Sequence, residues 1–234
     1  ELLTVDLIRT DLDLRRLIGE SDCEKIAQLL SEGYGEPVFK AIVSGPLDAD
    51  KQDYLVRDSH FCGVKYGVFD MQQLHRELGI VEDPEGGGKQ LAISADGVHA
   101  LEQFVLAKYY LTTQVYRHRV RLITDQMLIR AIRLGIEVSQ IQELRKLYNY
   151  DGSSAFLENY IQWNDARFLL TFGGEEGDFG RMVRRLLERK LLKQVYQKPL
   201  RELPENCRDA LSRISEPQHR HQRDKIEQVL SEDI

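Results

Sequence analysis

Long apolar runs are missing from this sequence. No stretch approaches the roughly 20 apolar residues that a helix needs to cross a bilayer, so we expect no membrane-spanning segment and no membrane partner. Cysteine is also scarce, because the chain has only 3 and none of them shows Cys-x-x-Cys spacing. A disulfide framework or a zinc module is therefore not expected. Together with the lack of a signal peptide, this favours a cytoplasmic location.

An excess of positive charge is missing as well. The 32 Lys and Arg residues are outnumbered by 38 Asp and Glu residues, which gives a net charge of −6. Nucleic acids are bound mostly through Lys and Arg on phosphates, so we do not expect nucleic acid as a main partner. An acidic protein that binds nucleotides would need its positive charge concentrated in a local pocket, helped by bound cations.

What is present indicates a helical protein. The 234 residues are 42% hydrophobic, which is enough to bury a core. Their spacing predicts a mainly α fold, an HD-domain-like multi-helix bundle with a small β-hairpin around a glycine-rich tip at residues 84–88. We expect a helical core over residues 1–200 and a polar, helical C-terminal appendage over residues 201–234.

Apolar spacing, caps and breakers place the expected helices. A capping box formed by Ser21 and Glu24 should start the second helix, and Asp70 should cap a later one. The longest helical stretch should carry a slight break near residues 120–124. The helices are expected within residues 1–20, 21–32, 38–43, 47–62, 66–78, 95–135, 139–148, 155–172 and 179–196.

The stretch over residues 47–62 carries the strongest functional signal. It has no helix breaker and is followed by Gly63, which is typical of a helix end. At 100° per residue, one arc of roughly 100° contains two carboxylates, an ammonium group and a phenol. These belong to Asp50, Lys51, Tyr54 and Asp58. The alternative is an exposed helix whose Asp53 and Arg57 pair contributes about 0.3 kcal/mol and no chemistry.

The run LDADKQDYLVRDSHFCGVKYGVFD resembles a signature of the HD-domain phosphohydrolases, specifically the branch of deoxynucleoside triphosphate triphosphohydrolases. The later run LEQFVLAKYYLTTQVYRHRV resembles the helix that adds phosphate and sugar contacts in that family, although Lys108 stands where arginine is usual. The resemblance implies a divalent metal ion, which would be Mn, Fe, Ni, Zn or Mg, with Asp50 as one ligand. It also implies a nucleotide substrate and a homo-oligomer.

The resemblance implies a role for each matching residue. Lys51 and Lys108 would neutralise phosphate oxygens, Tyr54 and Tyr116 would pack against the sugar, and Asp58 would accept a hydrogen bond from the 3′-hydroxyl. Hydrolysis would release a deoxynucleoside and tripolyphosphate. The family's histidine and His-Asp ligands, and its general acid, have no match here, so we expect them on polypeptide ahead of Glu1. No catalytic residue is therefore expected within this chain itself.

Two other functions fit the same residues. One is a phosphodiesterase or phosphomonoesterase that acts on another phosphoester, and the other is a non-catalytic regulator that binds a nucleotide and signals through oligomerisation. His118 is also open to two interpretations. It matches the family's Tyr-x-His motif, but a hydrogen-bonded histidine that holds helices together fits equally well.

Overall fold

The computed structural model describes residues 2–31, 35, 37–83, 88–194, 198–215, 221, 222 and 225. The chain divides into two units, Glu1–Leu191 and Leu192–Ile234, which are treated separately below. The boundary expected at residue 200 stays a prediction. Among the described residues, no helix is both long enough and apolar enough to cross a membrane.

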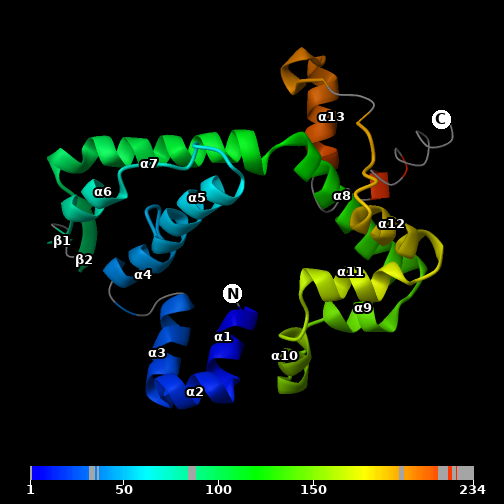
Figure 1. Ribbon diagram of the computed structural model, residues 1–234, viewed down its shortest axis with the longest axis horizontal. Helices are drawn as coiled ribbons and strands as arrows, with labels where there is room; N and C mark the ends of the chain where they lie inside the picture. Colours follow the sequence, from blue (N-terminus) through cyan, green and yellow to red (C-terminus); the bar gives the residue numbers. More distant parts are fainter. Residues whose placement is uncertain are drawn as a thin grey trace. The chain divides into compact units, whose positions relative to one another are not determined.

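The predicted mainly α fold is confirmed, and Figure 1 shows the order of the elements by colour. The early helices of the first unit are α1 (Leu2–Thr10), α2 (Leu12–Ile18), α3 (Glu20–Leu30), α4 (Pro37–Ser44), α5 (Ala49–Phe61) and α6 (Met71–Glu77). Its later helices are α7 (Val98–Leu111), α8 (Arg119–Arg133), α9 (Gln142–Leu147), α10 (Ser154–Tyr160), α11 (Asp165–Gly173) and α12 (Gly177–Leu187). The second unit contains the short turn η4 (Leu200–Glu202) and α13 (Glu205–Ser215).

The helix expected over residues 1–20 is in fact two helices. The side chain of Asp11 accepts a hydrogen bond from the backbone N–H of Leu14 at 2.8 Å, so it caps α2 and separates it from α1. The expected capping box at Ser21 is wrong. Gly19 has a φ of 95°, which turns the chain so that α3 begins at Glu20 and Ser21 lies inside its first turn.

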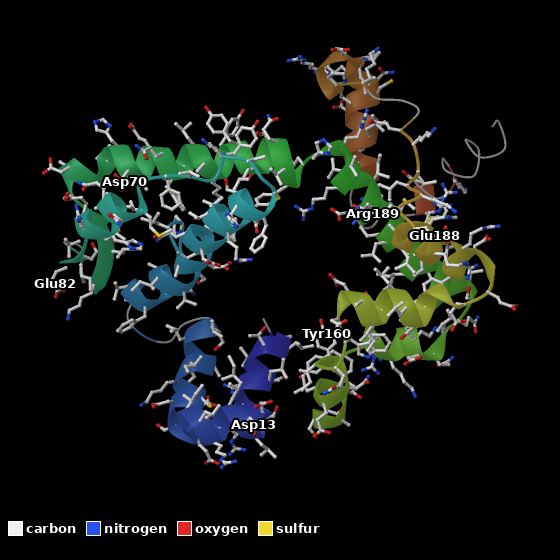
Figure 2. All side chains as sticks on the ribbon, viewed as in Figure 1. Asp13, Asp70, Glu82, Tyr160, Glu188 and Arg189 are labelled. Atoms are coloured by element: carbon white, nitrogen blue, oxygen red, sulfur yellow. The ribbon has the colours of Figure 1, made fainter. Side chains whose placement is uncertain are left out.

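The expected β-hairpin follows α6. Strand β1 (Leu78–Glu82) pairs antiparallel with β2 (Lys89–Ile93), and Leu78 is opposite Ile93 in the register. Residues 84–87 of the expected glycine-rich tip lie outside the described residues. Asp70, labelled in Figure 2, caps α6 as predicted by accepting a hydrogen bond from the N–H of Gln73 at 2.9 Å.

The long helical stretch breaks earlier than expected. A 3₁₀ turn, η1 (Ala95–Gly97), leads into α7, and a π-helical turn, η2 (Thr112–Tyr116), ends it. In η2 the N–H of Arg117 bonds the carbonyl of Thr112, five residues back, at 2.9 Å. His118 is exposed and extended, and its Nδ1 accepts a hydrogen bond from the N–H of Val120 at 3.3 Å. His118 therefore caps α8 within its own segment instead of joining two helices.

The later helices are shorter than predicted. A second π turn, η3 (Leu134–Val138), ends α8. Asn164 accepts a hydrogen bond from the N–H of Arg167 at 2.9 Å, so it starts α11 and divides the helix expected over residues 155–172. The helix expected to reach Tyr196 ends at Leu187, where Arg189 adopts a φ of 57°.

Two hydrophobic cores lie in the first unit. The signature core is built from α5, α6 and α7 and buries Leu55, Phe69, Leu74, Ala100, Phe104, Ala107 and Leu111. The aromatic core is built from α8, α9, α11 and α12 and buries Ala131, Leu144, Phe172, Phe179 and Val183. In the aromatic core the centroid of the Phe172 ring lies 5.5 Å from that of Trp163, 4.9 Å from that of Phe168 and 5.6 Å from that of Phe179.

Candidate functional site

Helix α5 begins at a buried aspartate. Asp48 is 3% exposed, and its Oδ1 accepts a hydrogen bond from the backbone N–H of Lys51 at 2.7 Å. The ammonium group of Lys51 donates to Oδ2 of Asp48 and, at 3.0 Å, to the carbonyl of Gly45. Lys51 is therefore held at the start of its own helix, and its role at a phosphate stays a prediction.

The inner face of α5 carries polar as well as apolar side chains, because Gln52, Leu55 and Ser59 are all buried. The hydroxyl of Ser59 donates to the carbonyl of Val64 at 2.6 Å and accepts from the N–H of Gly67 at 3.2 Å. A Cβ on Gly67 would lie 2.0 Å from the carbonyl oxygen of Leu55. Only glycine allows the backbone after α5 to come this close to the helix.

Gln52 connects the start of α5 to α6. Its Nε2 donates to the carbonyl of Leu47 at 3.0 Å, which fixes the orientation of the amide. Its Oε1 lies 2.6 Å from Nε2 of His75 and can only accept a hydrogen bond there. The imidazole of His75 therefore carries its proton on Nε2, and the Gln52 amide fixes the position of α5 beside α6.

Asp50 lies on the outer face of α5. Its side chain is exposed, and among the described residues its carboxylate makes no hydrogen bond or ion pair. It is therefore available as an oxygen ligand for a divalent cation. One carboxylate does not hold such an ion alone, and the described part of the chain contains no group of three His, Cys, Asp or Glu residues placed to do so.

Tyr54, Asp58 and Tyr116 come together although 58 residues separate the last two. The phenol of Tyr116 donates to Oδ2 of Asp58 at 2.6 Å, and its ring lies edge-on to Tyr54 with centroids 6.1 Å apart. Burial and the bond to Asp58 raise the pKa of Tyr116. Burial also raises the pKa of Tyr54, against the opposing charge of Lys51. Both phenols are thus neutral near pH 7.

Lys108 does not join this cluster. It is half-buried on α7, and no hydrogen bond or ion pair between described residues links it to Tyr54, Asp58 or Tyr116. Val105, which precedes Lys108 by three residues on α7, is 55% exposed. The buried side of α7 is the neighbouring stripe that contains Phe104 and Leu111.

Several residues of this region were not predicted. Arg121 lies with its guanidinium 5.6 Å from the centre of the Tyr116 ring and donates to the Tyr116 carbonyl at 3.3 Å. The cap role of Asp48 could have been predicted, because an aspartate three residues before Lys51 at a helix start is a known capping position. The pairing of Gln52 with His75 leaves no local signal, because 23 residues separate them.

Known proteins match a large part of this chain. The family model described as the HD associated region matches residues 69–230, which begin just after α5. The uncharacterized protein YwfO of Bacillus subtilis is 28% identical over 179 residues, covering 74% of this chain and 40% of YwfO. The uncharacterized protein MJ1154 of Methanocaldococcus jannaschii is 33% identical over 125 residues, covering 51% of this chain and 27% of MJ1154. The chain thus spans less than half the length of these relatives. Because the family model matches more than half of the chain, the chain belongs to the HD associated region family.

Proposed function

We propose that the full-length protein is a metal-dependent phosphohydrolase that acts on nucleotides, and that it hydrolyses deoxynucleoside triphosphates to deoxynucleoside and tripolyphosphate. The observation that carries the proposal is the outer face of α5. An exposed carboxylate without a partner among the described residues, Asp50, lies one turn before a tyrosine and aspartate cluster that includes Tyr54 and Asp58. Membership of the HD associated region family supports a link to HD-domain chemistry.

Asp50 fits the role of one metal ligand. Carboxylate oxygens suit Mg²⁺ and Mn²⁺ and occur with imidazole around Fe, Ni and Zn. A bound divalent ion would supply an activated water and neutralise phosphate charge. The remaining ligands would come from residues of the full-length protein other than those described here.

The cluster around Tyr116 is suited to a sugar. Oδ2 of Asp58 is occupied by the Tyr116 phenol, and Oδ1, which lies 3.9 Å from the Arg57 guanidinium, would accept a hydrogen bond from a 3′-hydroxyl. The bond also fixes the Tyr116 ring, so the ring and Tyr54 can form a firm apolar wall beside the ribose. A wall of this kind would favour a sugar that lacks a 2′-hydroxyl. Lys108, on α7, would supply positive charge for the phosphates.

The decisive experiment uses the full-length protein. Each deoxynucleoside triphosphate is incubated with Mn²⁺ or Mg²⁺, and the products are separated to detect tripolyphosphate. Asp50→Ala should lower turnover by about a thousandfold, because a lost metal ligand removes several kcal/mol of transition-state stabilisation. Asp53→Ala is the matched control, since Asp53 is an exposed aspartate on the same helix that pairs with Arg57. It should change turnover less than about twofold.

Each other outcome identifies a different function. Cleavage of an aromatic phosphate ester without release of tripolyphosphate would show a phosphodiesterase or phosphomonoesterase. Nucleotide binding without any turnover would show a non-catalytic regulator. Equal turnover in Asp50→Ala and the wild type would remove Asp50 from the metal site and contradict the proposal.

A further inference from the structure

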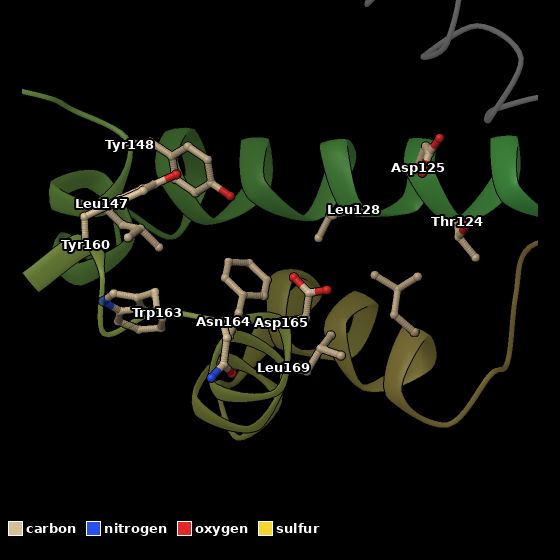
Figure 3. A pocket seen from close by; sticks show the side chains of 12 residues that line it. Thr124, Asp125, Leu128, Leu147, Tyr148, Tyr160, Trp163, Asn164, Asp165 and Leu169 are labelled. Carbon is tan, nitrogen blue, oxygen red and sulfur yellow. The ribbon is translucent and has the colours of Figure 1, made fainter. Parts of the chain in front are cut away.

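A hollow lies in the first unit, against the aromatic core. It has a volume of about 510 Å³ and is lined from α8, α9, α11 and α12 and from the residues around α10. Its walls are largely apolar. Leu128 of α8 faces Leu169 of α11 (Figure 3), and Leu147 and Phe168 also line the hollow. A hollow of this size and composition can take a small organic molecule.

The aromatic side of this hollow is firmly held. The ring of Trp163 stacks on Phe172 with centroids 5.5 Å apart and planes 8° apart, and the guanidinium of Arg167 lies 4.6 Å from the Trp163 ring centre. Tyr148 and Tyr160 line the same end. Burial, followed by the nearby Tyr160, raises the pKa of Tyr148, so its phenol is neutral near pH 7.

One carboxylate that lines the hollow has no ion-pair partner among the described residues. Asp165 lies in the first turn of α11, and Figure 3 shows its carboxylate pointing from α11 toward α8. No described residue makes a hydrogen bond or ion pair with this carboxylate. The other acidic residue of the lining, Asp125, is paired with Arg121 at 3.7 Å. The hollow therefore combines apolar and aromatic walls with a single free negative charge.

We propose that this hollow binds a small organic cation, a primary ammonium or guanidinium group carried on an apolar, preferably aromatic, body. The body would fill the space between Leu128, Phe168 and Leu169. The carboxylate of Asp165 is exposed, and the cationic head would meet it beside the apolar walls, where the attraction between the charges is stronger than in bulk water. Faces of tyrosine rings also attract cations. Anions, including nucleotides, would be repelled, so this site does not depend on the function proposed for α5.

A purely structural role for Asp165 is the main alternative. An acidic side chain in the first turn stabilises a helix by about 0.3 to 1 kcal/mol without any ligand. Such a role requires neither the apolar hollow nor a cationic partner. The two explanations therefore differ in whether ligand affinity depends on the Asp165 charge.

The test measures binding to the full-length protein by calorimetry with three probes of similar size. The amine 2-phenylethylammonium should bind at least about tenfold more tightly than neutral 2-phenylethanol, and anionic 3-phenylpropanoate should bind more weakly still. Asp165→Asn should weaken the amine about tenfold and leave the alcohol unchanged. Glu143→Gln is the matched control, because Glu143 also lies in a first helical turn, that of α9, and does not line the hollow.

Tryptophan fluorescence locates the bound amine. Trp163 lines the hollow, so binding of the amine should change the tryptophan emission of the wild type. The Trp163→Phe variant should lose this change. Equal affinities for amine and alcohol, or an Asp165→Asn variant that binds the amine as tightly as the wild type, would overturn the proposal. Absence of measurable amine binding in a correctly folded wild type would overturn it as well.

Discussion

The signature core around α5, α6 and α7 buries polar side chains among its apolar ones, whereas the aromatic core around α8, α9, α11 and α12 is packed mainly by aromatic rings. The buried polar or charged residues of the described chain are Asp48, Gln52 and Ser59, and all three lie on α5 or at its start. Each of them is hydrogen-bonded to the backbone nearby. In the aromatic core, Phe172 instead contacts three other rings.

The two cores differ in how they fix the positions of their helices. A buried hydrogen bond is directional and costly to leave unmade, so the bonds of Gln52 and Ser59 fix one arrangement of the backbone around α5. Ring packing depends mainly on the area buried, and it can leave space such as the hollow beside Trp163. The signature core therefore holds the outer face of α5 in place through directional bonds as well as apolar burial, whereas the aromatic core depends on apolar burial and ring packing.

The largest expected effect on stability is in the aromatic core. Phe172→Ala should lower the free energy of unfolding by about 3 to 5 kcal/mol, because it opens a cavity between Trp163, Phe168 and Phe179. Urea unfolding measures the loss, and hydrogen exchange should show it first in α11 and α12. Leu170→Ala is the control on the same helix, since Leu170 is 70% exposed and should change stability by less than about 0.5 kcal/mol. Equal losses in the two variants would contradict the assignment of Phe172 to this core.

A smaller and more local effect is expected in the signature core. Ser59→Ala removes no apolar volume but leaves the buried N–H of Gly67 without its partner, which costs about 1 to 3 kcal/mol. Hydrogen exchange should rise over residues 64–67 more than elsewhere. Ser44→Ala, at the exposed end of α4, is the control and should be nearly neutral. If exchange rose instead throughout the aromatic core, the contrast between the two cores would not hold.

The smallest effect is expected at Tyr116. Tyr116→Phe keeps the ring but loses the bond to Asp58, which should cost about 0.5 to 1.5 kcal/mol near pH 7. Tyr109→Phe is the control, because Tyr109 is a 60% exposed tyrosine on α7 and should be within about 0.5 kcal/mol of the wild type. Unfolding in urea compares the two variants. A Tyr116→Phe protein as stable as the wild type would show that this bond adds nothing to the fold.

The same variant has a distinct pH dependence. The pKa of Tyr116 is raised in the folded protein, so the folded state keeps its phenol proton where the unfolded state loses it. This stabilising contribution is fully present below about pH 10 and is lost as the pH rises toward the folded-state pKa. Stability should therefore fall less steeply above about pH 10 in Tyr116→Phe than in the wild type. Some dependence remains, because the bond to Asp6 raises the pKa of Tyr150 to about 12.

Local signals in the sequence were sufficient for much of the fold. Spacing of apolar residues predicted the helices, Asp70 marked the start of α6, and a hairpin was predicted around the glycine-rich stretch at residues 84–88. These features depend on interactions within a few residues, so a single sequence contains them. Caps that divide a helical stretch, such as Asp11 and Asn164, were missed because the apolar pattern continues across them.

By itself, the sequence determined that the chain is mainly helical and that Asp50, Tyr54 and Asp58 lie on the same side of α5. Only the tertiary structure decided which of these side chains are free, because partners distant in sequence compete for them: Tyr116 occupies Asp58, whereas Asp50 has no partner among the described residues. The tertiary structure also decided that α7 ends at Leu111 and is followed by the π turn η2. Periodicity within one helix does not contain that information, because it arises from packing between helices.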